Sequence, residues 1–117
     1  MKIENYLNTE QFKTRAQLVK ETGLTDRTVR NAISELKKTR PVIYNSQTRG
    51  YRLAKDINSF NTVNAAIQES ELIQHCINDI EARIEDMDKS EQTYIAYLNK
   101  LNDAIVILSN ENHIPGY

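Results

Sequence analysis

The clearest pattern of hydrophobic and polar positions lies between residues 25 and 38. Val29, Ile33 and Leu36 recur there at the spacing of one helical face. A second face carries polar and cationic side chains at i, i+3, i+4, i+7 and i+11, namely Arg27, Arg30, Asn31, Ser34 and Lys38. The pattern therefore predicts an amphipathic helix whose outer face presents guanidinium, amide and hydroxyl groups. Such side chains can read base edges in a DNA major groove.

A shorter helix is predicted immediately before this one, over residues 15 to about 22. Thr14 is a suitable N-cap, and Gln17 stands three residues later, as in a capping box. Gly23 follows at the position where a left-handed residue ends a helix, and Thr25 is a suitable cap for the next one. The expected order of helix, glycine turn and helix is that of a helix-turn-helix motif.

Two short β-prone segments follow the second helix. Pro41 prevents the helix from continuing, after which residues 42–44 and 51–53 are rich in β-branched and aromatic side chains. Residues 45–50 between them are typical of a turn. The sequence therefore predicts a β-hairpin wing, with Arg49 at its tip in position to contact a phosphate or enter the minor groove.

Beyond a polar linker at residues 55–61, apolar residues follow a 4-3 repeat typical of a coiled coil. No Gly or Pro interrupts it, so the pattern favours one continuous helix that pairs with a second copy. The alternative is two helices packed in a dimeric bundle, because Asp88 and Glu91 could form a capping box. Parallel pairing, antiparallel pairing and assemblies larger than a dimer, such as a tetramer, all remain open. The predicted dimerisation residues are Val63, Ile73, Ile77, Ile80, Ile84, Met87, Tyr94, Leu98, Leu101, Ile105 and Leu108.

Charge divides the 117 residues into two halves. Residues 1–55 contain 12 Lys or Arg against 5 Asp or Glu, whereas the rest contains 3 against 11. Only the basic half is suited to a polyanion. We therefore expect a mainly α (α+β) protein with a DNA-binding domain at residues 1–56 and an acidic helical dimerisation segment at residues 57–117.

The segment from residue 12 to 53 resembles the winged helix-turn-helix domain of biotin-repressor-type and DeoR-type bacterial regulators. The resemblance rests on the short motifs Gln17-Leu18, Gly23-Leu24-Thr25, Thr28-Val29, Ile33 and Arg49-Gly50-Tyr51-Arg52-Leu53. It implies only the DNA-reading module, because nothing after residue 53 resembles the ligase or sugar-sensing domains of those families. Together with two lysines expected to touch phosphates, the predicted DNA contacts are Thr25, Asp26, Arg27, Thr28, Arg30, Asn31, Ser34, Lys37, Lys38 and Arg49.

No residues are spaced for catalysis or metal binding. Cys76 is the single cysteine, which excludes an intrachain disulfide, and His75 and His113 stand apart from other candidate ligands. We therefore expect no enzymatic activity and no cofactor. No stretch approaches the roughly 18 to 20 apolar residues of a membrane span, and no secretory signal is evident. A cytoplasmic protein without membrane contact is expected.

The leading hypothesis is a homodimeric, sequence-specific transcriptional regulator that acts as a repressor on a near-palindromic site of double-stranded DNA. In a second hypothesis, the acidic half binds a protein partner, as in anti-CRISPR-like inhibitors or adaptors of mobile elements, while the winged helix autoregulates. A third is a replication-initiation or partition protein.

Overall fold

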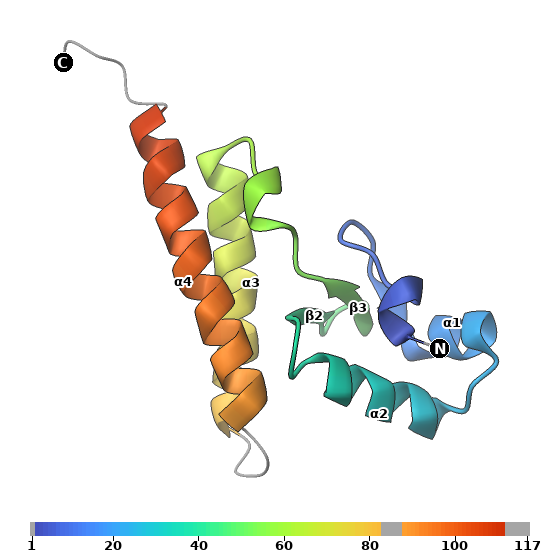
Figure 1. Ribbon diagram of the computed structural model, residues 1–117. Coiled ribbons are helices and arrows are strands. Elements are labelled where there is room, and N and C mark those ends of the chain that lie inside the picture. Colours follow the sequence, from blue (N-terminus) through green and yellow to red (C-terminus); the bar gives the residue numbers. More distant parts are fainter. Residues whose placement is uncertain (1, 83–87, 112–117) are drawn as a thin grey trace.

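The computed structural model describes residues 2–82 and 88–111. Its helices are α1 (Arg15–Thr22), α2 (Asp26–Leu36), α3 (Val63–Ala82) and α4 (Asp88–Glu111), and its strands are β1 (Lys13–Thr14), β2 (Val42–Asn45) and β3 (Gly50–Leu53). Short 3-10 turns cover Ile3–Tyr6 and Ile57–Ser59. Figure 1 shows α1, α2 and the strands together in one unit, which we call the N-terminal unit, beside a pair formed by α3 and α4, which we call the helical pair. The expected α+β class, with helices predominating, is confirmed.

Both short helices begin at the predicted caps. The Thr14 hydroxyl accepts the backbone N–H of Gln17 at 3.1 Å, and the Gln17 side-chain oxygen accepts the backbone N–H of Thr14 at 2.8 Å. Gly23 follows α1 with φ at 74°, a conformation that glycine adopts without a steric cost. The Thr25 hydroxyl then accepts the N–H of Thr28 at 3.2 Å and starts α2. The order of helix, glycine turn and helix is as predicted.

The sheet is antiparallel, with β3 in the centre of the order β1-β3-β2. Tyr44 stands opposite Tyr51 in the predicted hairpin, and their ring centroids are 4.9 Å apart. On its other side β3 pairs Gly50 with Thr14. A Cβ atom on Gly50 would lie 2.6 Å from the Cβ of Phe12, so only glycine allows this close approach. The two-residue strand β1, which was not predicted, ties the start of α1 to the hairpin.

One core fills the space between α1, α2 and the sheet. Its buried members are Ile3, Leu7, Leu18, Val29, Ile33, Val42 and Leu53. Leu18 of α1 and Val29 of α2 are fully buried, and complete burial of such a side chain contributes roughly 1.5 to 3 kcal/mol. The two helices are therefore packed firmly across the glycine turn, and the outer face of α2 has a defined orientation.

The acidic half forms two helices, so the prediction of one continuous helix is wrong. α3 ends at Ala82, α4 begins at Asp88, and the two lie antiparallel, side by side (Figure 1). The predicted seam residues meet inside one chain, where the buried ones are Ile73, Ile77, Tyr94 and Leu101 and the half-buried ones are Val63, Ile80, Leu98, Ile105 and Leu108. Ile84 and Met87 lie outside the described residues. A chain that folds back buries its own apolar stripe without the entropic cost of association.

A second core joins the helical pair to the sheet. Its buried members come from both halves of the chain and are Ile43, Ala54, Ile73, Ile77 and Tyr94. The Tyr94 hydroxyl accepts the backbone N–H of Val42 at 2.9 Å and donates to the Val42 carbonyl at 2.7 Å. Thr93, one residue earlier on α4, donates to the carbonyl of Lys38 at 2.6 Å. Packing is therefore continuous across residue 56, where the charge pattern changes.

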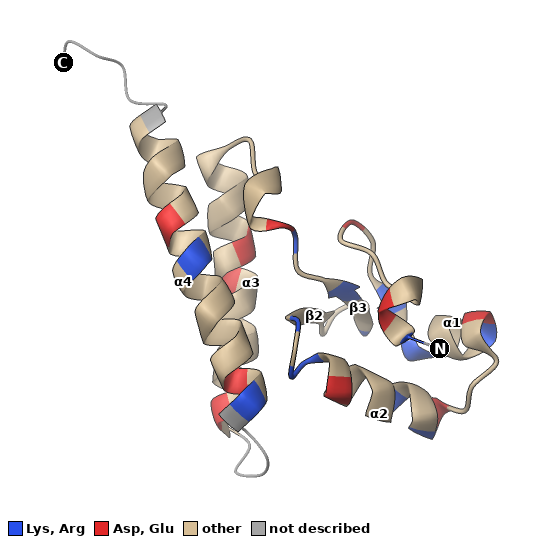
Figure 2. Cartoon of the chain, in the orientation of Figure 1, with Lys and Arg blue, Asp and Glu red and all other residues tan. Residues whose placement is uncertain are grey.

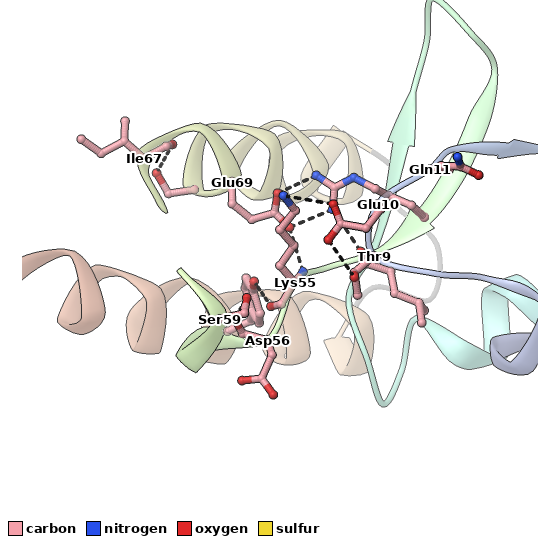
Figure 3. A network of polar contacts seen from close by, with 12 residues as sticks. Thr9, Glu10, Gln11, Lys55, Asp56, Ser59, Ile67 and Glu69 are labelled. Atoms are coloured by element: carbon pink, nitrogen blue, oxygen red, sulfur yellow. Dashed lines mark hydrogen bonds and ion pairs between the residues drawn. The ribbon is translucent and has the colours of Figure 1, made fainter. Parts of the chain in front are cut away.

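The same junction contains a buried ion pair between β3 and α3. The Arg52 guanidinium donates to both carboxylate oxygens of Glu69, at 2.9 and 2.6 Å. Glu69 also accepts the backbone N–H of Lys55 at 2.9 Å, and Figure 3 shows these two residues together. The Tyr97 hydroxyl of α4 donates to the carbonyl of Lys55. The start of the segment predicted as a linker is therefore fixed to both helices of the pair.

Candidate nucleic-acid interface

The outer face of α2 carries the polar stripe that the sequence predicted. Val29 and Ile33 of α2 are buried, which turns the opposite side of the helix to the surface. The predicted contact residues in the first three turns are all exposed, namely Thr25, Asp26, Arg27, Thr28, Arg30, Asn31 and Ser34. Figure 1 shows the first turn of α2 at the end of the helix that is far from the helical pair. The stripe is therefore accessible along most of its length.

Asp26 links the stripe to α1. Its carboxylate oxygens lie 3.4 Å from the Nε atom of Arg15 and 3.4 Å from the Nε atom of Arg30. All three side chains are about half exposed, so these are weak surface ion pairs that a phosphate could replace. Arg15 was not among the predicted contact residues. The sequence placed Arg15 in the first turn of α1, directly after the Thr14 cap. It did not indicate that this turn lies beside α2.

A groove of about 610 Å³ separates the first turns of α1 and α2 from the tip of the hairpin. Its lining residues are Thr14, Arg15, Ala16, Val19, Asp26, Thr48 and Arg49. Arg49 is exposed and has φ at 58°, a left-handed conformation that is uncommon outside glycine and that closes the turn before β3. The groove therefore brings Arg49 of the predicted wing next to Arg15 and Asp26.

The two predicted lysines lie just beyond α2, which ends at Leu36 and not at Lys38 as predicted, and they are not part of this groove. Lys38 is half-buried and forms an ion pair with Glu35 at 3.1 Å. Lys37 is also half-buried and lines a cavity of about 280 Å³ with Tyr44, Cys76 and residues of both halves. The structure therefore separates the lysines from the stripe formed by the first three turns.

The N-terminal unit keeps two exposed arginines outside its ion pairs. Each of its five acids is within 4 Å of a basic nitrogen, and these acids are Glu4, Glu10, Glu21, Asp26 and Glu35. Within residues 2–82 and 88–111, neither Arg27 nor Arg49 has an ion-pair partner. Figure 2 shows Lys and Arg concentrated on the N-terminal unit and few of them on the helical pair. The basic residues therefore gather on the N-terminal unit, which includes the stripe and the groove.

Other kinds of site were also sought among the described residues. No group of three or more His, Cys, Asp and Glu side chains is placed there to hold a metal ion. None of the helices in these ranges is both long enough and apolar enough to cross a membrane. Cys76 is half-buried, and burial raises the pKa of its thiol, so at neutral pH it stays protonated and poorly nucleophilic.

Comparisons with known proteins add no assignment. No protein-family model matches the chain, and the searches of curated proteins and of solved structures returned no significant match. The functional argument therefore depends on the residues and the geometry described above.

Proposed function

We propose that the N-terminal unit is a winged helix-turn-helix module that binds double-stranded DNA, with α2 as the recognition helix and the β2–β3 hairpin as the wing. The observation that carries the proposal is the exposed stripe of Arg27, Arg30, Asn31 and Ser34 on a helix whose opposite face is buried. Arginine and asparagine form bidentate hydrogen bonds to guanine and adenine in the major groove. The protein then acts as a homodimeric transcriptional regulator of a near-palindromic site.

The proposed contacts divide into two kinds. Arg27, Arg30 and Asn31 read bases, because they project from the first two turns of a recognition helix. Arg15 and Arg49, which both line the groove at the N-terminal end of α2, bind phosphates. Asp26 holds Arg15 and Arg30 in place until a phosphate or a base replaces it as their partner.

Repression is the regulatory outcome that we propose. A protein that occupies a promoter or its own operator prevents transcription by occlusion alone, without a contact to the transcription machinery. The N-terminal unit and the helical pair suffice for such a mechanism, since they provide DNA binding and association of two copies. Homodimers of this type bind half-sites about one helical turn, roughly 34 Å, apart.

Selection of bound fragments from random and genomic DNA tests the proposal. The expected result is enrichment of one near-palindromic motif, lost in an Arg27→Ala, Arg30→Ala variant and retained in Lys100→Ala, which removes an exposed cation from α4 instead. Absence of any enriched sequence at moderate salt would contradict the proposal. Enrichment of repeat arrays at an origin or a centromere, instead of promoter sites, would identify a replication or partition protein.

A protein-binding role for the helical pair is the second candidate, because α3 and α4 expose several large aliphatic side chains. The two halves share a core, so separated fragments are unsuitable for distinguishing the candidates. Point variants of the full chain are preferable. If the Arg27→Ala, Arg30→Ala variant keeps the biological effect and a variant of the exposed aliphatic residues abolishes it, the adaptor is correct and the regulator is not.

A further inference from the structure

The helical pair keeps exposed aliphatic side chains after its seam has closed. Ile67 of α3 is 36% exposed, and Ile95, Val106 and Ile107 of α4 are 40%, 59% and 57% exposed. The only other large hydrophobic residue this exposed among those that the structure describes is Tyr44. Single exposed aliphatic residues are common on soluble proteins, so their arrangement decides whether they form a surface.

The arrangement follows from the contacts of each helix. Thr93 of α4 bonds to Lys38 of the N-terminal unit and Tyr97 bonds to Lys55, which directly follows that unit, so both mark the side of α4 that faces it. At 3.6 residues per turn, Ile95 and Val106 lie on the side turned away from that unit. Ile67 occupies the corresponding side of α3, where Glu69 marks the side that faces the sheet. Ile67, Ile95 and Val106 therefore share the outer face of the helical pair.

The outer line of α4 consists of Ile95, Asn99, Asn102 and Val106, at i, i+4, i+7 and i+11, and these four residues carry no charge. The other exposed line of α4 consists of Ala96, Lys100, Asp103 and Ile107 and includes two charged residues. The outer line of α3 consists of Ile67, Glu71, Gln74, Asn78 and Glu81 and includes two acids, so of the two outer lines only that of α4 is uncharged between Ile95 and Val106. Residues 56–117 have 11 acids against 3 bases, so two such halves repel each other except along an uncharged line.

The outer line of α4 is also self-complementary. If two α4 helices cross antiparallel about a two-fold axis between Lys100 and Leu101, Ile95 meets Val106 of the other copy. The same axis brings Asn99 opposite Asn102. Apolar side chains then meet at both ends and amides meet in the centre, where they can form hydrogen bonds to each other. No shift in register is needed for both kinds of pair to form.

We propose that a second copy of this chain binds the outer face through α4, so that two helical pairs form a four-helix bundle. The inference rests on the proposed function and deepens it, because it names the surface that joins two DNA-binding units in one homodimer. It replaces the predicted seam, whose described residues already pack within one chain. The two N-terminal units then lie on opposite sides of the bundle, each with its stripe and groove free.

Neighbouring residues provide a matched test in the absence of DNA. Val106 and Ile107 have nearly equal exposure but belong to different lines of α4. Light scattering of the full chain is expected to give a dimer for the wild type and for Ile107→Asp. Val106→Asp is expected to weaken the dimer by about 100-fold or more, because it places a carboxylate against Ile95 in each of the two apolar contacts. Circular dichroism and thermal unfolding of each variant show that the fold is kept.

A second variant tests the register itself. Ile95→Lys is expected to weaken the dimer as Val106→Asp does, and the double variant Ile95→Lys, Val106→Asp is expected to restore it, because each lysine then faces an aspartate of the other copy. A monomeric wild type, dissociation of the Ile107→Asp variant to the same extent, or no rescue in the double variant overturns the proposal. A monomer that still selects one half-site leaves the proposed DNA-binding function intact. A dimer that passes these tests but selects no DNA would support the α4 interface and contradict the proposed DNA-binding function.

Discussion

Arg52 of β3 and Glu69 of α3 form a two-pronged ion pair that is almost completely buried, with 5% and 2% of their surfaces exposed. The pair joins the central strand of the sheet to the helical pair. Each partner makes a further hydrogen bond, because Arg52 donates to the carbonyl of Leu53 and Glu69 accepts the backbone N–H of Lys55. The basic and acidic halves are therefore connected by a specific polar contact as well as by a shared core.

Replacing Glu69 with Gln is expected to lower the free energy of unfolding by about 3 to 5 kcal/mol, because the buried Arg52 loses its counter-charge. The double variant Arg52→Met, Glu69→Leu is expected to recover most of this loss, since neither buried charge remains. Urea denaturation followed by circular dichroism measures both values. A loss below about 1 kcal/mol in Glu69→Gln, typical of an exposed pair, would contradict the buried geometry.

Tyr94→Phe removes the hydroxyl that bonds both backbone groups of Val42 and keeps the buried ring. The expected loss is about 1 to 3 kcal/mol of unfolding free energy, because a buried N–H and a buried carbonyl each lose a partner. Tyr44→Phe is the matched control. This side chain is exposed and its hydroxyl has no hydrogen bond among the residues that the structure describes, so a change within about 0.5 kcal/mol is expected. Equal effects of both substitutions would rule out a structural role for the Tyr94 hydroxyl.

Arg30→Ala and Arg49→Ala are expected to affect DNA binding differently, because the first removes a base contact and the second removes a phosphate contact. Arg30→Ala should cost about 1 to 3 kcal/mol on the selected site and relax the preference at one base pair. Arg49→Ala should weaken binding to all sequences alike and reduce the salt dependence by about one counterion. Mobility-shift titrations at several salt concentrations measure both. A uniform loss in Arg30→Ala would assign this arginine to a phosphate instead of a base.

The thiol of Cys76 is expected to make the free energy of unfolding decrease as the pH becomes alkaline. Burial raises its pKa in the folded chain above that of the unfolded chain, so the folded state binds this proton more tightly. Its contribution to stability is complete below the unfolded thiol pKa of about 8.5 and is lost as the pH rises towards the folded value. Urea denaturation between pH 7 and pH 10 is therefore expected to show a decline that is smaller in Cys76→Ala. Identical slopes for both proteins would show that the thiol is not protected by the fold.

The two short helices and the hairpin within residues 1–53 were predictable because their signals are local. The caps at Thr14 and Thr25, the left-handed Gly23 and the break at Pro41 each act over a few residues, and each appears in the structure at its predicted place. The exposed stripe of α2 followed from helical spacing, since Val29 and Ile33 could be buried only if the arginines faced out. Arg15, in contrast, reaches this surface only because α1 packs against α2 and Asp26 lies beside it.

The sequence by itself determined where the helices of the N-terminal unit begin, how its hairpin turns and which face of α2 is polar. Tertiary structure alone decided that the apolar repeat closes within one chain, because the same pattern satisfies a long helix paired with a second copy and two helices paired with each other. It also decided the roles of Arg52 and Glu69. The pattern of hydrophobic positions does not reveal a buried charged residue such as Arg52. Glu69, 17 positions later, reaches it only when β3 and α3 pack together.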